Sequence, residues 1–188
     1  MVRVLMHGCC GAMGRVITGL AADREDLKIV AGVDRNTDDS LGYPVFQSLE
    51  ACDVEVDAII DFTAAPAVDH LLDYCAEKKV PVVLCSTGLS DAQMAKVSES
   101  AKKVAVLRSA NMSLGINLLM KLVKDAAATL ADAGFDIEIV EKHHNRKLDA
   151  PSGTALALAD SINEAMEDRY HYTLPLIHIS EPTRHSLI

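Results

Sequence analysis

The sequence predicts an α/β fold with a parallel, doubly wound central sheet for residues 1–110. Two observations lead to this prediction. Short apolar runs alternate with helical patterns along this stretch, and the links between them are short, which favours parallel strands joined by helices. The runs are continuous in valine, isoleucine and leucine instead of alternating with polar residues, which is typical of strands buried on both faces.

Each element follows from its own local pattern. Apolar runs predict five strands, at residues 2–6, 27–33, 56–60, 80–84 and 104–107. Helical spacing predicts two helices, at residues 13–22 and 65–77. A third helix is expected from residue 90 to about residue 102, because Ser90 and Gln93 have the spacing of a capping box.

After Asn111 the pattern changes, and residues 111–170 are expected to form a second domain of α+β type. Ser113 is a suitable cap for a long helix over residues 114–131. A further helix is expected over residues 153–166.

Two other stretches after Asn111 have distinct sequence patterns. Residues 136–141 alternate between polar and apolar side chains, which predicts a strand in a sheet with one solvated face. Residues 171–188 contain two prolines and three histidines and follow neither a helical nor a strand period. We therefore expect this last stretch to be a disordered or non-native tail.

Composition narrows the possible functions. The chain has 188 residues, with 27 acidic against 18 basic side chains and a net charge of −9, which argues against nucleic acid as a partner. No apolar run approaches the roughly 20 residues that span a bilayer, and the first residues lack a signal-peptide pattern. Five cysteines without CxxC spacing predict reduced thiols in a cytoplasmic protein, with neither a disulfide framework nor a metal site.

Glycines at positions 8, 11 and 14 follow the first expected strand and open the first expected helix. We expect Gly8 to make a tight turn, Gly11 to let the backbone approach a pyrophosphate, and Gly14 to allow close helix packing. Asp34 stands twenty residues after Gly14, at the end of the next strand, where it can accept hydrogen bonds from a ribose. Together these features predict a Rossmann-type site for a nicotinamide dinucleotide.

The choice between NADH and NADPH stays open at this point. Asp34 favours NADH, whereas the neighbouring Arg35 could pair with the 2′-phosphate of NADPH or be a solvated cation. Other loops at the ends of expected strands, such as Asp61-Phe62-Thr63, lie at the edge where ligands bind in open α/β sheets. The thiols of Cys9 and Cys10 are interpreted as small fillers of the phosphate loop.

A cluster of basic and proton-carrying side chains occupies residues 141–154. His143, His144 and Lys147 follow a predicted strand end, and Ser152 can cap the next helix. The amides of Gly153 and Thr154 would then be available to an anion at the helix start. This arrangement indicates a receptor for a small carboxylate that undergoes proton-coupled chemistry.

Several motifs occur in order between residue 2 and about residue 167. They are Gly8-x-x-Gly11-x-Met13-Gly14-Arg15, Asp61-Phe62-Thr63, Ser86-Thr87-Gly88, Asn111-Met112-Ser113-x-Gly115-x-Asn117 and Glu141-x-His143-His144-x-x-Lys147-x-Asp149-Ala150-Pro151-Ser152-Gly153-Thr154. In these motifs the chain resembles the 4-hydroxy-tetrahydrodipicolinate reductase (dihydrodipicolinate reductase) family. The last motif is highly specific, whereas the first is shared with many dehydrogenases.

The resemblance implies a reaction and a set of residues. It implies reduction of a cyclic imine-type dicarboxylate by NADH or NADPH in lysine and diaminopimelate biosynthesis. It makes His143 the proton donor and acceptor and Lys147 a second proton donor, and it assigns His144, Gly153 and Thr154 to the substrate. The residues that it places around the cofactor are Gly8, Cys9, Cys10, Gly11, Ala12, Met13, Asp34, Arg35, Cys85, Ser86, Thr87, Ser109, Ala110, Asn111 and Met112.

The resemblance also implies that the chain is truncated. The family continues after the second domain's helix with further strands, which residues 171–188 do not match. We therefore expect an incomplete α+β substrate and oligomerisation domain and a poorly formed version of the family's homotetramer. Cofactor binding should persist while turnover is weak or absent.

Two other functions remain open on the sequence. One is a non-enzymatic dinucleotide-binding module whose basic cluster binds a protein or effector. The other is a different Rossmann dehydrogenase of amino-acid biosynthesis, such as a homoserine or semialdehyde dehydrogenase. A semialdehyde dehydrogenase needs a cysteine nucleophile after its cofactor domain, and no cysteine follows Cys85.

Overall fold

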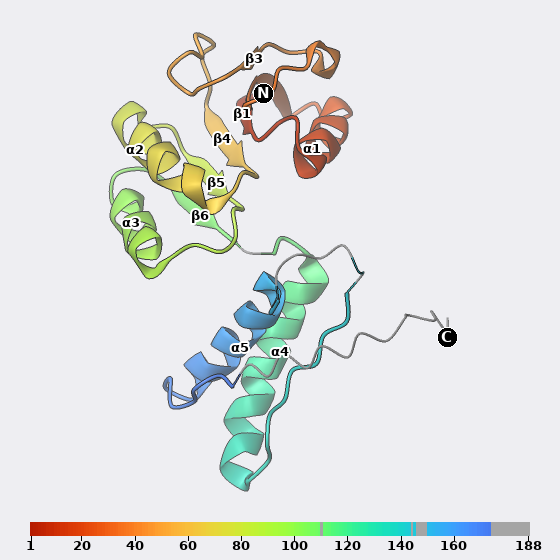
Figure 1. Cartoon of the computed structure of the whole chain (residues 1–188), viewed down its shortest axis with the longest axis vertical. Helices are drawn as coiled ribbons and strands as arrows, with labels where there is room; N and C mark the ends of the chain where they lie inside the picture. Colours follow the sequence, from red (N-terminus) through yellow and green to blue (C-terminus); the bar gives the residue numbers. More distant parts are fainter. Residues whose placement is uncertain (110, 144, 146–149, 174–188) are drawn as a thin grey trace. The chain divides into compact units, whose positions relative to one another are not determined.

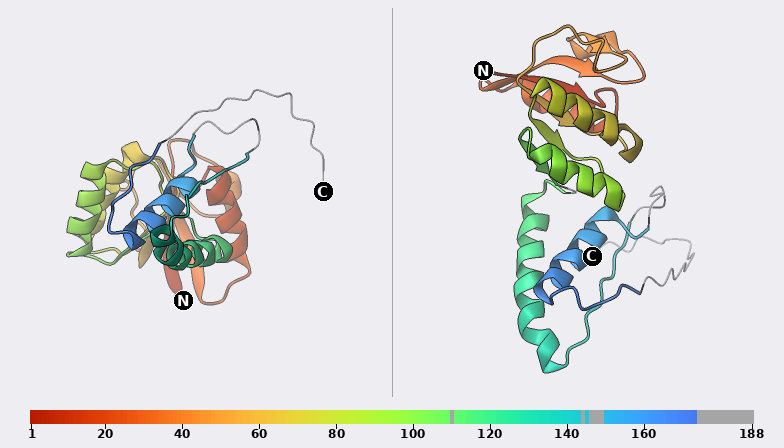
Figure 2. Two further views of the ribbon diagram at one scale, coloured as in Figure 1. Left: turned by 90° about the horizontal axis from the view of Figure 1, so that it is seen from below. Right: turned by 90° about the vertical axis from the view of Figure 1, so that its left-hand side faces the viewer.

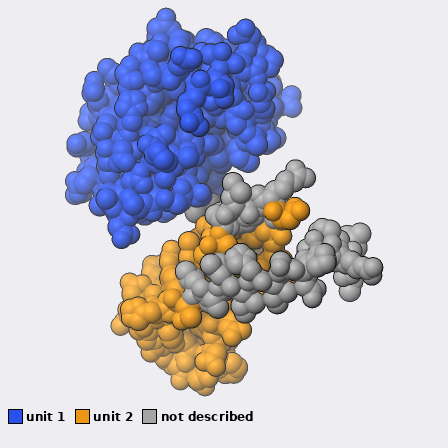
Figure 3. Space-filling model, in the orientation of Figure 1, with its two compact units in different colours: residues 1–112 blue, residues 113–188 orange. Residues whose placement is uncertain are grey.

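The structure is a computed structural model that describes residues 1–109, 111–143, 145 and 150–173. The chain divides into two compact units, Met1–Met112 and Ser113–Ile188, which are coloured separately in Figure 3. Each unit has its own secondary structure, and each is described by itself below.

The first unit is built on a six-stranded parallel sheet (Figure 1). Its strands are β1 (Val2–His7), β2 (Leu27–Val33), β3 (Val45–Phe46), β4 (Ala58–Asp61), β5 (Val82–Leu84) and β6 (Val106–Arg108). Their order across the sheet is β3-β2-β1-β4-β5-β6, with every neighbouring pair parallel. This is the order of dinucleotide-binding doubly wound sheets, and it confirms the predicted fold class.

Helices cover both faces of this sheet (Figure 1). One face packs against α1 (Ala12–Ala22), and the other against α2 (Val68–Lys78) and α3 (Asp91–Ala101). Along β1, Leu5 enters the core under α2, whereas Val4 and Met6 enter the core under α1. Alternate residues therefore serve opposite faces, and this explains why the strands read as continuous apolar runs.

The boundaries of most elements lie within about two residues of the expected ones. The Ser90 capping box is present: Gln93 N donates to Ser90 Oγ (3.3 Å), and Ser90 N donates to Gln93 Oε1 (3.1 Å). Strand β3 was not expected, because it has only two residues and is defined by its pairing with β2. Short 3-10 turns at Asp39–Leu41, Ala65–Ala67 and Ala131–Ala133 complete the described elements.

The described part of the second unit contains two α-helices, α4 (Leu114–Leu130) and α5 (Gly153–Ala165), which lie side by side (Figures 1 and 2). Both have the expected serine caps: Ser113 Oγ accepts from the Ile116 amide, and Ser152 Oγ accepts from the Ala155 amide. Their contact buries a small core of Ala127, Ile162 and Met166. None of the helices within the described residues is both long and apolar enough to cross a membrane.

The prediction of a strand at residues 136–141 is wrong. In the structure this segment is extended chain without strand pairing, and Ile137, Ile139 and Val140 are exposed. The described residues of the second unit include no strand that could be its partner. Alternating side chains specify two faces, but a strand also needs a neighbour for its backbone hydrogen bonds.

Candidate functional site

The loop after β1 has the backbone conformation of a tight glycine turn. Gly8 has φ = 84°, and its N–H donates to the carbonyl of Val33 at 2.8 Å. A Cβ at Gly8 would lie 2.9 Å from the carbonyl oxygen of Phe62, so a larger residue would collide with the backbone after β4. The loop is therefore fixed between two strand ends at the carboxyl edge of the sheet.

Helix α1 begins directly against this loop. A Cβ at Gly14 would lie only 2.3 Å from the Gly8 carbonyl oxygen, so glycine is needed for the close approach of helix and loop. Gly11 is the N-cap residue and makes no side-chain cap hydrogen bond. A helix start without a capping side chain can present its amides to an anion. This geometry agrees with the turn and packing roles predicted for Gly8 and Gly14, while contact with a pyrophosphate stays a prediction.

Asp34 follows β2 and faces the same loop. Its Oδ2 accepts from the amide of Cys10 at 3.0 Å, and its Oδ1 accepts from the amide of Asn36 at 3.2 Å. The carboxylate is half-buried, whereas the neighbouring Arg35 is exposed. The structure thus brings Asp34 and the glycine loop together, although 20 residues separate Asp34 from Gly14.

Arg15 joins this arrangement, and the sequence analysis gave it no role beyond its place in a motif. Its guanidinium pairs with Asp38 at 2.5 Å and donates to the carbonyl of Cys10 at 3.2 Å. Hydrogen bonds from Ser40 and then from Arg15 lower the pKa of Asp38 to about 2. Arg15 therefore connects the start of α1 to the turn after Asp34, and its position one residue after Gly14 was the available signal.

A buried carboxylate connects three of the strand ends. Asp61 ends β4 and is fully buried. Its Oδ1 lies 2.8 Å from His7 Nδ1 and accepts a hydrogen bond from Thr63 Oγ1 at 2.7 Å. Its Oδ2 accepts a hydrogen bond from Ser86 Oγ at 2.6 Å. Burial alone would raise the pKa of Asp61, but the hydrogen bonds from His7, Ser86 and Thr63 outweigh it and hold the pKa below its ordinary value. This network holds the loop after β5, to which three of the expected cofactor residues belong.

The remaining residues expected at the cofactor lie on the same unit. Cys85 and Ser86 are buried at the end of β5, and Thr87 is exposed beside them. Burial, and then the charge of Asp61, raise the pKa of the Cys85 thiol to about 11.

Ser109 follows β6, and its Oγ donates to the carbonyl of Asn111 at 2.7 Å. Three further residues complete the set: Ala12 and Met13 are exposed in the first turn of α1, and Met112 is exposed at the end of the unit. Ala110 lies outside the described residues.

The second unit holds the expected proton-transfer residue, His143. Its Nδ1 lies 3.5 Å from Glu141 Oε2, and its side chain is 40% exposed. Glu141 Oε1 accepts from the Ser152 amide at 2.8 Å, and Oε2 accepts from Ser152 Oγ. One carboxylate therefore holds both His143 and the first residue before α5. Glu141 belonged to the recognised motif, but the sequence assigned it no role.

The other expected substrate residues are placed less completely. Gly153 and Thr154 form the first turn of α5, as expected from the Ser152 cap. His144 and Lys147 lie outside the described residues, so their predicted roles stay predictions.

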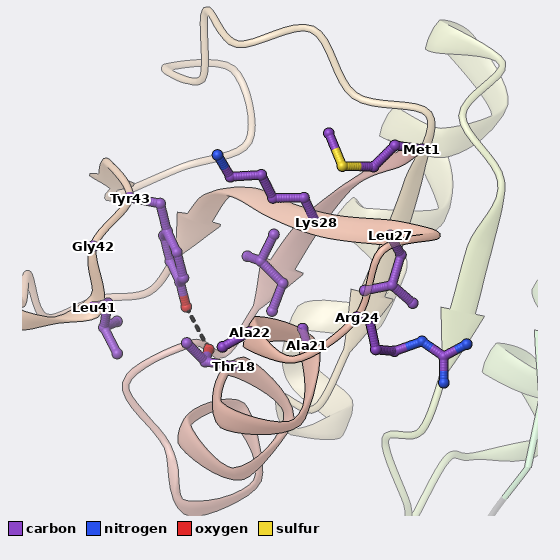
Figure 4. Close-up of a pocket in the computed structure, with 11 residues that line it drawn as sticks. Met1, Thr18, Ala21, Ala22, Arg24, Leu27, Lys28, Leu41, Gly42 and Tyr43 are labelled. Carbon is purple, nitrogen blue, oxygen red and sulfur yellow. Dashed lines mark hydrogen bonds between the residues drawn. The ribbon is translucent and has the colours of Figure 1, made fainter.

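A separate pocket of about 240 Å³ lies in the first unit, between the end of α1 and the start of β2 (Figure 4). Tyr43 OH and Thr18 Oγ1 are 2.7 Å apart at one side of it. The remaining lining residues are Met1, Ala21, Ala22, Arg24, Leu27, Lys28, Ile29, Leu41 and Gly42. None of the residues expected to bind cofactor or substrate lines this pocket.

Comparison with known proteins gives two family models that together match most of the chain. The model described as dihydrodipicolinate reductase, N-terminus, matches residues 2–112, and the model of its C-terminus matches residues 115–184. The second match includes part of the stretch that the sequence analysis set apart as a tail. That domain assignment stays a prediction.

Individual relatives agree with the family models. The chain is 49% identical over 172 residues to 4-hydroxy-tetrahydrodipicolinate reductase of Caldanaerobacter subterraneus subsp. tengcongensis, covering 92% of this chain and 67% of that protein. It is 45% identical, with the same coverage, to the enzyme of that name from Clostridium tetani. A solved structure of dipicolinate-bound dihydrodipicolinate reductase from Paenisporosarcina sp. TG-14 matches with a TM-score of 0.73 and 30% identity, over 100% of this chain and 72% of that one.

The chain spans about two thirds of the length of these relatives. The family models, the identities and the shared fold confirm the resemblance that the sequence motifs indicated, and with it a Rossmann-type oxidoreductase architecture. The chain belongs to the dihydrodipicolinate reductase family.

Proposed function

We propose that this protein reduces 4-hydroxy-tetrahydrodipicolinate to tetrahydrodipicolinate with NADH or NADPH, as a cytoplasmic step of lysine and diaminopimelate biosynthesis. The observation that carries the proposal is the Glu141–His143–Ser152 arrangement at the start of α5, in a chain whose first unit has a dinucleotide-type glycine loop. The family membership and the named activity of the relatives support it.

The first unit offers a fitting cradle for the cofactor. The cofactor would supply a hydride to the conjugated ring of the substrate. Its pyrophosphate would meet the amides at the start of α1, and its adenosine ribose would donate to Asp34. The carboxylate of Asp34 favours the free ribose hydroxyls of NADH, whereas the exposed Arg35 beside it favours the 2′-phosphate of NADPH. Both cofactors are therefore expected to bind.

The second unit would supply the proton and hold the substrate. His143 can protonate the carbon next to the one that receives the hydride, and Glu141 orients its imidazole ring. We assign Lys147 as a second proton donor and His144, Gly153 and Thr154 to the substrate carboxylates. A dicarboxylate suits this cationic segment, and the Paenisporosarcina relative was solved with dipicolinate, a dicarboxylate, bound.

Replacement of His143 tests the proposal. His143→Ala should lower the single-turnover rate of nicotinamide oxidation by roughly 10²- to 10⁴-fold, the usual contribution of a general acid. NADH affinity, measured by fluorescence, should stay unchanged. The matched control is His70→Ala, which removes an exposed histidine paired with Glu50 in the first unit and should alter neither quantity. An unchanged rate of nicotinamide oxidation in His143→Ala would contradict the role given to His143.

Glu141 can be tested in the same assay as a positioning residue. Glu141→Gln keeps the size of the side chain but replaces one carboxylate oxygen by an amide nitrogen. The variant therefore loses either an acceptor for Ser152 or the oxygen that faces His143. We expect the rate to fall about tenfold, which is part of the roughly 10²- to 10⁴-fold that a well-placed general acid contributes. Glu138→Gln, at an exposed position in the same segment, is the control and should leave the rate unchanged.

A further inference from the structure

Two thiols and a carboxylate converge beside the glycine loop. The sulfur atoms of Cys9 and Cys10 are 3.9 Å apart. One ligand atom from each of Cys9, Cys10 and Asp34 lies within 4.8 Å of the other two. The sequence predicts no metal site, because these cysteines lack CxxC spacing. Asp34 reaches them because β1 and β2 are adjacent and parallel, so the two strand ends lie together.

The separation of the two sulfurs suits a single tetrahedral cation. A zinc ion bound to two thiolates at about 2.3 Å each holds the sulfurs roughly 3.8 Å apart. The observed 3.9 Å needs almost no adjustment. The carboxylate oxygen of Asp34 lies within 4.8 Å of both sulfurs, so a small movement of its side chain would bring it to the usual zinc–oxygen distance of about 2.0–2.2 Å. A fourth position is left for water.

The surrounding contacts hold these ligands in place. Asp34 accepts from the amides of Cys10 and Asn36. Cys9 Sγ packs against Gly32 of β2, where a Cβ would lie 2.6 Å from the sulfur. Such outer contacts orient metal ligands and strengthen binding. Cys10 and Asp34 are half-buried and give a path from solvent, while Cys9 is fully buried.

We propose that Cys9, Cys10 and Asp34 form a site for a thiophilic divalent cation of the Zn²⁺ or Cd²⁺ class. Each thiol would lose its proton to solvent as its sulfur binds, so the site would hold two thiolates and one carboxylate. Soft sulfur ligands select such cations over Mg²⁺ or Ca²⁺. A second consequence rests on the proposed function: Cys10 and Asp34 also belong to the cofactor site, so the cation and the dinucleotide exclude one another.

Cadmium is a suitable probe, because its bond to thiolate sulfur gives an ultraviolet charge-transfer absorption. The reduced, metal-free chain is titrated with Cd²⁺ and, separately, with Mg²⁺. We expect one Cd²⁺ per chain, and no response to Mg²⁺. Cys10→Ser should halve the absorption and weaken binding at least tenfold, and Asp34→Asn should weaken binding with the absorption retained. Cys52→Ser, which removes a half-buried thiol elsewhere in the first unit, is the control and should leave the titration unchanged.

The possible results distinguish the proposed cation site from the proposed cofactor site. Identical Cd²⁺ titrations for wild type and Cys10→Ser, or no thiolate absorption, would overturn the cation site. If the site exists, NADH should shift the Cd²⁺ midpoint to higher concentration. Simultaneous binding of Cd²⁺ and NADH would overturn the exclusion. Failure of the metal-free chain to bind NADH would count against the proposed cofactor site and leave the cation site supported.

Discussion

The two units of the chain differ in how far they bury their own apolar surface. In the first unit, a sheet covered on both faces encloses large side chains completely, among them Leu5, Ile59 and Leu72. In the second unit, the hydrophobic cluster of the described residues consists of Ala127, Ile162 and Met166. Leucines along α4 are exposed, Leu114 by 86% and Leu118 by 54%.

The residues expected to bind the cofactor and the residue expected to transfer the proton therefore lie on differently packed parts of the chain. The residues expected at the cofactor stand at the edge of a sheet whose strand ends are connected by Asp61 and by close contacts at Gly8 and Gly14. His143, the expected proton-transfer residue, stands on a segment without regular structure that is linked through Glu141 to the start of α5. Cofactor binding should therefore depend on the first unit, and turnover on how well this second segment is held.

Paired leucine substitutions test the contrast with the largest expected effect. Leu72→Ala empties a fully buried position and should lower the free energy of unfolding by about 3–4 kcal/mol. Leu118→Ala removes a half-exposed side chain and should change it by less than about 0.5 kcal/mol. Urea unfolding curves measure both. A loss at Leu118 as large as that at Leu72 would mean that the α4 surface is covered in solution.

Asp61→Asn tests whether the strand ends depend on one carboxylate. Asparagine replaces an accepting oxygen by a donor and leaves a buried hydrogen bond unmade, which should cost about 2–3 kcal/mol at neutral pH. The pKa of Asp61 is lowered in the folded protein, so its contribution is present above the unfolded pKa of about 3.9 and is lost as the pH falls through the lower folded value.

The difference in stability between wild type and Asp61→Asn should therefore shrink in acid. Asp53→Asn, at an exposed position of the same unit, is the control and should track wild type throughout. A difference that is constant from neutral pH to strong acid would contradict the role given to the Asp61 charge.

Helix caps give the smallest effect and compare the units directly. Ser90→Ala and Ser152→Ala each remove a cap hydrogen bond and should each cost about 1 kcal/mol in chemical unfolding. Only Ser152 also donates to Glu141, so only its replacement should slow turnover. Equal turnover in both variants would show that the hydrogen bond from Ser152 Oγ to Glu141 does not affect the rate.

Much of the first unit could be predicted because its signals are local. Continuous apolar runs indicated β1 and β2, and the spacing of Gly8, Gly11 and Gly14 indicated a turn followed by a closely packed helix. The contacts of Asp61 with His7 and Ser86 could not be derived, because they join residues 54 and 25 positions apart through the sheet. An acidic residue that ends an apolar strand was the one available signal.

The second unit shows where local pattern is insufficient. The serine caps at Ser113 and Ser152 are local features and were predicted. The strand at residues 136–141 was not a safe inference from alternation, because strand pairing depends on a neighbour elsewhere in the chain. The role of Glu141 was also missed, since it depends on Ser152 eleven residues later.

The central claim is that the loop from Gly8 to Met13 and Asp34 hold the dinucleotide. A crystal structure of the protein with NADH tests it most directly. We predict density for the pyrophosphate against the amides at the start of α1, with the adenosine ribose at Asp34. Density for NADH elsewhere, for instance in the pocket beside Tyr43 and Lys28, or no bound NADH at saturating concentration, would contradict the claim.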